Sequence, residues 1–254
     1  MEFFDACMPL GRTNWGITES PCTQSQILSL MDRYNVAEAL VYHTLARDSD
    51  PDMGNAALGK EITNRRLHRI WAFDAAYVIE RTPAEFLDSA LQNNVKAIMF
   101  NPQMRDVQID RSLRLAELAA MLQKRRIPLI AAYRRFNYGS DMINWYQLTD
   151  FCNAFPELPV ISWEWRTLAN RPMFDALALT KNLRICITSI WQAQMVNQIC
   201  DSFGSRRLIF SLGLPHLDPA SFVPVITYAG LDTAAMNALA SENIQQILQE
   251  ADYE

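Results

Sequence analysis

The segment VKAIMFNPQMRDVQIDRSLRLAELAAMLQKRRIPLIAAY, residues 95–133, contains the pattern that decides the fold. It begins and ends with short apolar runs, at 95–101 and 127–133. Both runs are apolar on successive residues, as parallel strands buried between two layers are. Between them, residues 110–126 form the clearest helical pattern of the chain, with an apolar face of Leu113, Ala116, Leu118 and Leu122. The segment therefore predicts a strand, a helix and a second strand.

The same alternation repeats along the whole chain. Strand-like runs occur at residues 3–7, 37–43, 68–75, 95–101, 127–133, 158–165, 183–189 and 206–212. Helical patterns follow them at residues 23–36, 54–67, 83–94, 110–126, 141–155, 170–180, 191–203 and 232–251. Eight such units in 254 residues predict one α/β domain over residues 1–254, a closed (β/α)8 TIM barrel. A doubly wound open sheet is the alternative, but no Gly-x-Gly-x-x-Gly follows the first run.

Composition excludes several classes of protein. The net charge of −5 argues against a binder of nucleic acid or of an anionic membrane, which would carry a basic stripe. No run of about 18 apolar residues could cross a bilayer, and the first residues do not resemble a secretory signal. The five cysteines form no Cys-x-x-Cys motif. We therefore expect a cytoplasmic protein with reduced thiols, and a homodimer fits a barrel of this size.

The reacting groups of a TIM barrel lie at the carboxyl ends of its strands. His43 ends the second predicted strand, and its pKa near neutrality suits a general acid or base. The alternative is a histidine hydrogen-bonded into the barrel rim. Asp74 and Asn101 end the next two strands. We predict proton transfer by His43 and Asp74, and a ligand contact for Asn101.

Several arginines follow the predicted strands at the same end. Arginine binds carboxylate or phosphate through two parallel hydrogen bonds, so a group of arginines predicts an anion pocket in this acidic protein. Each could instead pair with Asp48, Asp141 or Glu164. The predicted pocket residues are Arg47, Arg134, Arg135 and Arg166, with Glu164 orienting one of them.

The chain has too few histidines for a histidine-rich metal site. Its three histidines are His43, His68 and His216, and none forms His-x-His or His-x-x-x-His. His68 precedes its strand and should lie at the opposite end of the barrel. His216, in a proline-rich loop, is interpreted as structural or exposed. No cofactor is predicted.

Two further possibilities involve Asp5 and Cys7 of the first strand. A carboxylate metal site formed by Asp5, Asp74 and Glu164 ranks below the metal-free interpretation, since single carboxylates at strand ends commonly anchor loops. Cys7 could act as a nucleophile if a neighbouring base or positive charge lowered its pKa. A small buried core thiol is the favoured interpretation of Cys7.

Several segments resemble the amidohydrolase-related (amidohydrolase-2) branch of the amidohydrolase superfamily. FFDACMPLG at residues 3–11 is similar to its opening strand, and ILSLMDRYNVAEALVYHTLARDSDPDMGNAAL at 27–58 resembles its second unit. FPELPVISWEW, SRRLIFSLGLPHLDP and SENIQQIL resemble later units, the last including Asn243. The resemblance spans roughly residues 2 to 249 and implies a TIM barrel. It also implies metal-assisted hydrolysis or decarboxylation.

The metal ligands that the resemblance implies are replaced in this chain. The family places two histidines on strand one, one on each of strands five and six, and an aspartate after strand eight. The matching positions are Cys7 and Pro9, then Ala132 or Tyr133, Glu164 and Gly213. Proline, alanine and glycine offer no side-chain ligand, so the usual metal site is not expected.

Three functions are consistent with this sequence. The first is a metal-independent hydrolase of a small anionic molecule, either a carboxylate or a sugar acid. The second is a non-catalytic barrel that binds such an anion or a protein partner. In the third, a structural protein, side chains such as Trp163, Tyr133 and Met8 would plug the barrel mouth.

Overall fold

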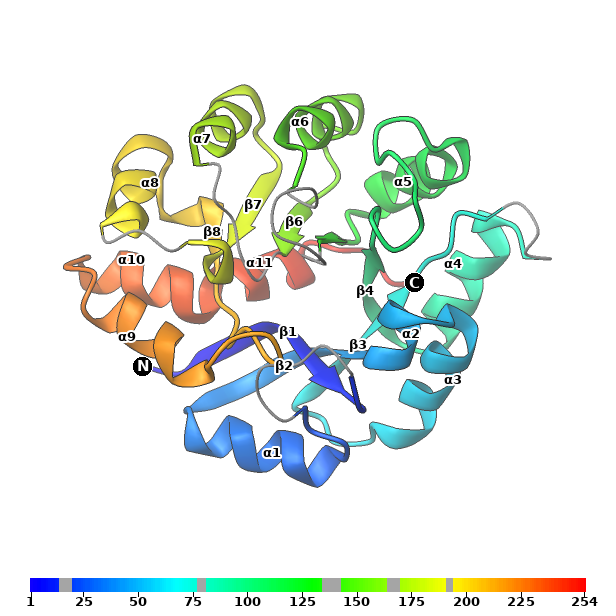
Figure 1. The fold of residues 1–254 in the computed structure, drawn as a ribbon, viewed down its shortest axis with the longest axis horizontal. Coiled ribbons are helices and arrows are strands. Elements are labelled where there is room, and N and C mark those ends of the chain that lie inside the picture. The colour runs from blue at the N-terminus through cyan, green and yellow to red at the C-terminus, as the bar shows by residue number, and fades with distance from the viewer. Residues whose placement is uncertain (14–19, 77–80, 134–142, 164–169, 191–193) are drawn as a thin grey trace.

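The computed structural model describes residues 1–13, 20–76, 81–133, 143–163, 170–190 and 194–254, whose strands form one parallel sheet ringed by helices (Figure 1). Each strand pairs with the next along the chain. This order confirms the predicted (β/α)8 barrel and rules out the doubly wound sheet. The strands are β1 (Phe3–Leu10), β2 (Val36–His43), β3 (Leu67–Ala72), β4 (Val95–Phe100), β5 (Leu129–Ala132), β6 (Val160–Trp163), β7 (Leu183–Cys186) and β8 (Leu208–Ile209).

The helices follow the predicted alternation with three differences. The helices are α1 (Gln24–Arg33), α2 (Thr44–Asp48), α3 (Pro51–Glu61), α4 (Pro83–Gln92), α5 (Leu113–Arg125), α6 (Trp145–Ala154), α7 (Asn170–Leu179), α8 (Met195–Phe203), α9 (Phe222–Thr227), α10 (Thr233–Asn237) and α11 (Asn243–Gln249). The short helices α2 and α9 were not predicted, because one turn leaves no periodic pattern. The helix predicted at 54–67 ends at Glu61. Leu113, predicted on the buried face of α5, is 74% exposed because it is the first helical residue.

The joint between β8 and β1 departs from a regular ladder. The strand predicted at 206–212 pairs only at Leu208 and Ile209. Beyond it, the Ala6 amide donates to the Phe210 carbonyl. The Asp5 carboxylate then accepts the Leu212 amide at 3.0 Å. A side chain thus supplies a hydrogen bond that a longer strand would have received from the backbone.

Apolar side chains form two layers, one inside the barrel and one between the barrel and its helices. The inner layer includes Phe4, Leu40, Tyr42, Met99, Ile130 and Trp163. Ile244 and Ile247 of α11 join this layer. Asn243 of α11 donates to the carbonyls of Ser205 and Leu208 at the start of β8. Helix α11 therefore closes the amino-terminal end of the barrel.

Within the described ranges, no helix is both long enough and apolar enough to span a bilayer.

Candidate functional site

Arg47 is a buried charged residue at the carboxyl ends of the strands. It lies in α2, directly after β2, and is 2% exposed. Its Nε and Nη2 donate to the two oxygens of Asp48 at 2.6 and 2.9 Å. Burial disfavours the guanidinium ion, but Tyr42 and Asp48 outweigh this effect and raise the pKa of Arg47. The arginine is therefore a permanent positive charge inside the barrel mouth.

The remaining donor of Arg47, Nη1, links two aromatic residues. It donates to the Tyr42 hydroxyl at 2.7 Å and contacts His216 Nε2 at 2.8 Å. A guanidinium group can only donate, so His216 Nε2 accepts and the proton of this neutral ring lies on Nδ1. Burial raises the pKa of Tyr42, which stays a phenol. Its hydroxyl hydrogen is left to bind another acceptor.

Trp163 forms one wall of this cluster. Its ring lies 5.6 Å from that of Tyr42 and 6.2 Å from that of His216, measured between centroids. The Arg47 guanidinium lies 5.8 Å from the Trp163 ring, a cation–π contact. His216 is 3% exposed, so an exposed position is wrong, and its structural role stays an interpretation. We call Tyr42, Arg47, Asp48, Trp163 and His216 the mouth cluster.

Two hydrogen-bond donors at this end of the barrel, one of them in the mouth cluster, are buried without an acceptor among the described residues. Trp163 Nε1 and Asn101 Nδ2 have no partner among the described residues. Ala132 pairs with Trp163, and continuing the register of β4 and β5 by one residue sets Asn101 at the same level. The Asn101 Oδ1 atom accepts the Met104 amide at 3.1 Å, which turns the amide nitrogen outward from that loop. The small Ala132 separates the two unpartnered donors.

His43 lies outside this cluster. In β2, Leu40 and Tyr42 belong to the inner layer, so His43 falls on the outward-facing row. Its Nδ1 accepts the Leu45 amide at 3.1 Å, capping α2, and its Nε2 is 3.9 Å from Glu61. Burial lowers the pKa of His43, and Glu61 partly opposes this shift. These contacts match the rim alternative, and the catalytic role remains a prediction.

Asp74 follows β3 on the row that continues inward from Ile70. One oxygen accepts the Ala76 amide at 2.9 Å, and the other lies 3.7 Å from Arg105 Nη1. Arg105 also donates to the carbonyls of Ala46 and Ser49 at the end of α2. Arg105 thus links Asp74 to the end of α2, the helix that contains Arg47.

The replaced ligand positions do not fit the metal that the fold family implies. Burial raises the pKa of Cys7 well above that of a free thiol, so Cys7 is a protonated core residue as favoured. Gly213 has φ of +76°, and a side chain there would meet Phe222, Leu217 and Thr188. Both oxygens of Asp5 accept backbone amides, from Cys7 and Leu212. No group of three or more His, Cys, Asp or Glu side chains suited to a metal occurs in the described part of the chain.

Four predicted pocket residues, Arg134, Arg135, Glu164 and Arg166, lie outside the described residues. The structure therefore places Arg47 in the mouth cluster and Asn101 at the level of Trp163, with His43 outside the cluster. Sequence reasoning missed Tyr42, Arg105 and the role of His216. The inward alternation of β2 could have identified Tyr42. Nothing in the sequence indicated that the loop after β8 folds over Arg47.

No protein-family model matches the chain, and no curated protein matches it by sequence. Solved structures do match it. The uncharacterised TIM-barrel protein Bb4693 from Bordetella bronchiseptica has a TM-score of 0.75 at 15% identity, over 98% of this chain and 99% of that one. The amidohydrolase map2389c from Mycobacterium avium subsp. paratuberculosis has a TM-score of 0.65 at 15% identity, over 89% and 74%.

The 2,6-dihydroxybenzoate decarboxylase from Rhizobium has a TM-score of 0.70 at 11% identity, over 98% of this chain and 99% of that one. At such identities the likeness establishes a shared fold. The chain shares the TIM-barrel fold of an amidohydrolase and of a decarboxylase, which agrees at the level of the fold with the resemblance noted in its sequence.

Proposed function

We propose that this chain is a metal-independent hydrolase of a small carboxylate or sugar-acid-like molecule that binds at the mouth cluster. The observation that carries the proposal is the pair of unpartnered donors, Asn101 Nδ2 and Trp163 Nε1. Burying a donor without an acceptor costs about 1–3 kcal/mol. A ligand oxygen would recover that free energy. The Tyr42 hydroxyl hydrogen is a third donor available at this site.

A carboxylate or a developing oxyanion is the ligand that suits these donors. Neutral N–H and O–H groups aimed at one oxygen stabilise negative charge that develops during acyl transfer. The positive charge of Arg47 lies behind Tyr42 and strengthens the donation from its hydroxyl, because hydrogen bonds in series polarise one another. Among the structural relatives, the Rhizobium enzyme is named for an aromatic carboxylate, which is consistent with this ligand class.

The remaining roles are assigned within the proposal. Asp74 is the favoured general base because it lies on the inward-facing row. His43 remains the second candidate. Arg134, Arg135 and Arg166, with Glu164, are proposed to complete the anion pocket.

The substitution Asn101→Asp tests the site. It keeps Oδ1 for the Met104 amide and replaces the unpartnered donor with a negatively charged acceptor. We expect at least a tenfold loss of affinity for 2,6-dihydroxybenzoate, citrate or glucuronate, whichever binds the wild type, measured by calorimetry. Asn64→Asp is the matched control, since Asn64 Oδ1 also accepts a backbone amide, at the opposite end of β3. Equal affinity in Asn101→Asp and the wild type would refute the proposed site.

A non-catalytic barrel that binds a small anion is the second candidate. The observation that favours it is the mouth cluster itself, whose buried and mutually paired side chains occupy the place where substrate binds in an active barrel. An assay of hydrolysis distinguishes the hydrolase from the non-catalytic barrel. Release of acid from sugar-acid lactones by the wild type, lost in Asp74→Asn, supports the hydrolase. Ligand binding without product supports the second candidate.

A further inference from the structure

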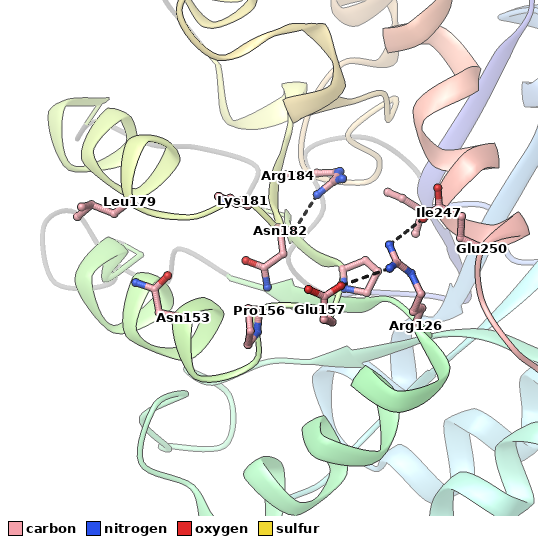
Figure 2. Close-up of a pocket in the computed structure, with 11 residues that line it drawn as sticks. Arg126, Asn153, Pro156, Glu157, Leu179, Lys181, Asn182, Arg184, Ile247 and Glu250 are labelled. Atoms are coloured by element: carbon pink, nitrogen blue, oxygen red, sulfur yellow. Dashed lines mark hydrogen bonds and ion pairs between the residues drawn. The ribbon is translucent and has the colours of Figure 1, made fainter.

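A hollow lies at the amino-terminal end of the barrel, opposite the mouth cluster. It has a volume of about 490 Å³ and lies between the start of β7, the loop before β6 and helix α11 (Figure 2). This size is within the range of small-molecule sites, about 300–1,000 Å³. Its wall combines cationic side chains, Arg126, Lys181 and Arg184, with the apolar residues Pro156, Leu179 and Ile247.

The acidic residues of the hollow are already occupied by other partners. Arg126 pairs with Glu157 at 3.4 Å and with Glu250 at 2.8 Å, as the dashed lines in Figure 2 mark. The other oxygen of Glu250 accepts from Gln246 at 2.7 Å. Both carboxylates therefore compensate Arg126, and neither forms an ion pair with Arg184 or Lys181.

Arg184 is a cationic residue of this hollow that forms no ion pair within the described ranges. It is the second residue of β7, on the inward row of that strand, and is half-buried. Its one hydrogen bond within the described ranges goes from Nη1 to the Asn182 carbonyl at 3.0 Å. Burial lowers its pKa, Glu250 opposes this shift, and Arg126 and Arg206 add smaller effects in the same direction as burial. Arg206 lines a smaller adjoining recess together with Arg184.

Arg126 and Arg206 repel the Arg184 guanidinium, and Glu250 offsets this repulsion in the empty hollow. Like charges at short range destabilise the folded chain unless an anion lies between them. A guanidinium fork with free N–H groups binds a phosphate through two parallel bonds, and a phosphate carries about 1.5 to 2 negative charges near neutral pH. The apolar side chains, among them the exposed Leu179, would contact the rest of an organic molecule.

We propose that this hollow is a second ligand site, in which Arg184, with Arg206 and Lys181 around it, binds the phosphate group of a small organic phosphate. The site is independent of the proposed mouth ligand, since its residues lie at the starts of β6 and β7 and on α11, whereas the mouth cluster lies at the carboxyl ends of the strands. It would let a phosphorylated compound bind while the mouth is occupied.

Calorimetric titration with phenyl phosphate, at constant ionic strength set by sodium chloride, tests this proposal. We expect saturable binding to the wild type and at least a tenfold weaker Kd in Arg184→Gln. Arg206→Gln, at an exposed position, should weaken binding about threefold. Arg111→Gln is the matched control, because Arg111 is an exposed arginine on a different part of the chain.

Failure of this proposal can be told apart from failure of the proposed function, because each site has its own variant. Asn101→Asp should leave phenyl phosphate affinity within about twofold, while Arg184→Gln should leave carboxylate binding at the mouth unchanged. If Arg184→Gln does not fold by circular dichroism, the loss in Arg206→Gln and in Lys181→Gln decides the question. No saturable binding to the wild type, or equal losses in Arg111→Gln and Arg184→Gln, would overturn the proposal.

Discussion

Arg47 and Arg184 occupy opposite ends of one barrel and differ in how their charge is compensated. Arg47 is 2% exposed and uses its donors on Asp48, Tyr42 and His216. Arg184 is half-buried, makes one hydrogen bond to a carbonyl, and has two other arginines as neighbours. At the mouth, the arginine is therefore buried and paired. At the amino-terminal end of the barrel, the arginine is accessible to solvent and forms no ion pair among the described residues.

The difference follows from solvent access. A charge taken out of water must be paired and hydrogen-bonded, or the chain does not fold. A charge at the wall of a hollow keeps part of its hydration and can exchange water for a ligand. Arg47 thus contributes to the architecture of the mouth, whereas Arg184 remains free to bind.

The largest effect is expected when the pairing of Arg47 is broken. Asp48→Ala leaves the buried guanidinium without its carboxylate and should reduce the free energy of unfolding by about 3 kcal/mol, measured by urea denaturation. The double variant Arg47→Met/Asp48→Ala should be more stable than Asp48→Ala alone, since no charge is then left uncompensated.

Glu157→Ala is the control at the amino-terminal end of the barrel. Its ion pair with Arg126 is exposed and 3.4 Å long, so we expect a loss below about 0.5 kcal/mol. Similar losses in Asp48→Ala and Glu157→Ala would contradict the distinction between the two ends.

A smaller effect is expected at Gly213, the position where the family resemblance implies an aspartate ligand. Gly213→Asp combines a left-handed backbone, φ +76°, with close contacts to Phe222 and Leu217, and should destabilise the fold by about 2 kcal/mol. Gly230→Ala has a similar φ, +73°, but its added Cβ would make only an ordinary contact with Asn197 at 3.8 Å, and should cost about 1 kcal/mol. If Gly213→Asp were as stable as the wild type, our account of the lost ligand would be wrong.

The smallest effect concerns the pH dependence set by His43. Burial lowers its folded pKa below 6.5, so the unfolded state binds more protons as the pH falls through that value. The contribution of His43 to the free energy of unfolding is therefore complete above about pH 6.5 and decreases as the pH falls. His43→Asn keeps an N-cap acceptor for Leu45 but cannot titrate.

Urea denaturation between about pH 7.5 and about pH 5 should therefore show a smaller decrease in stability for His43→Asn than for the wild type. Parallel pH curves would exclude a contribution from His43. The same variant tests its catalytic role, because full turnover in His43→Asn leaves Asp74 as the remaining candidate base.

The alternation of apolar runs and helical patterns was enough to predict the barrel, since each element is determined by its own residues. The seam between β1 and β8 was not predictable, because it depends on Asp5 reaching the Leu212 amide across the sequence. The mouth could be predicted only in part. Asn101 and Arg47 follow strands, so the sequence places them at the mouth, but Arg47 pairs with Asp48 as the alternative proposed and the ligand contacts of both remain predictions. His216 reaches Arg47 through a loop whose path no local pattern encodes.

The orientation of His43 was ambiguous for a related reason. Ending a strand places a residue at the functional end of a barrel, but the alternation of the strand decides whether it faces inward. Tyr42, not His43, occupies the inward row of β2. The cationic and apolar residues of the hollow at the amino-terminal end come from four separate segments, so no local pattern predicts that they meet.

Metal content tests most directly the claim that the mouth works without the metal of the fold family. The purified protein would be incubated with zinc and with manganese, desalted, and measured by elemental mass spectrometry. The account predicts well below one equivalent of either metal, because Cys7, Pro9, Ala132 and Gly213 stand where ligands are required. One retained equivalent per chain, with carboxylate binding that depends on it, would contradict the account.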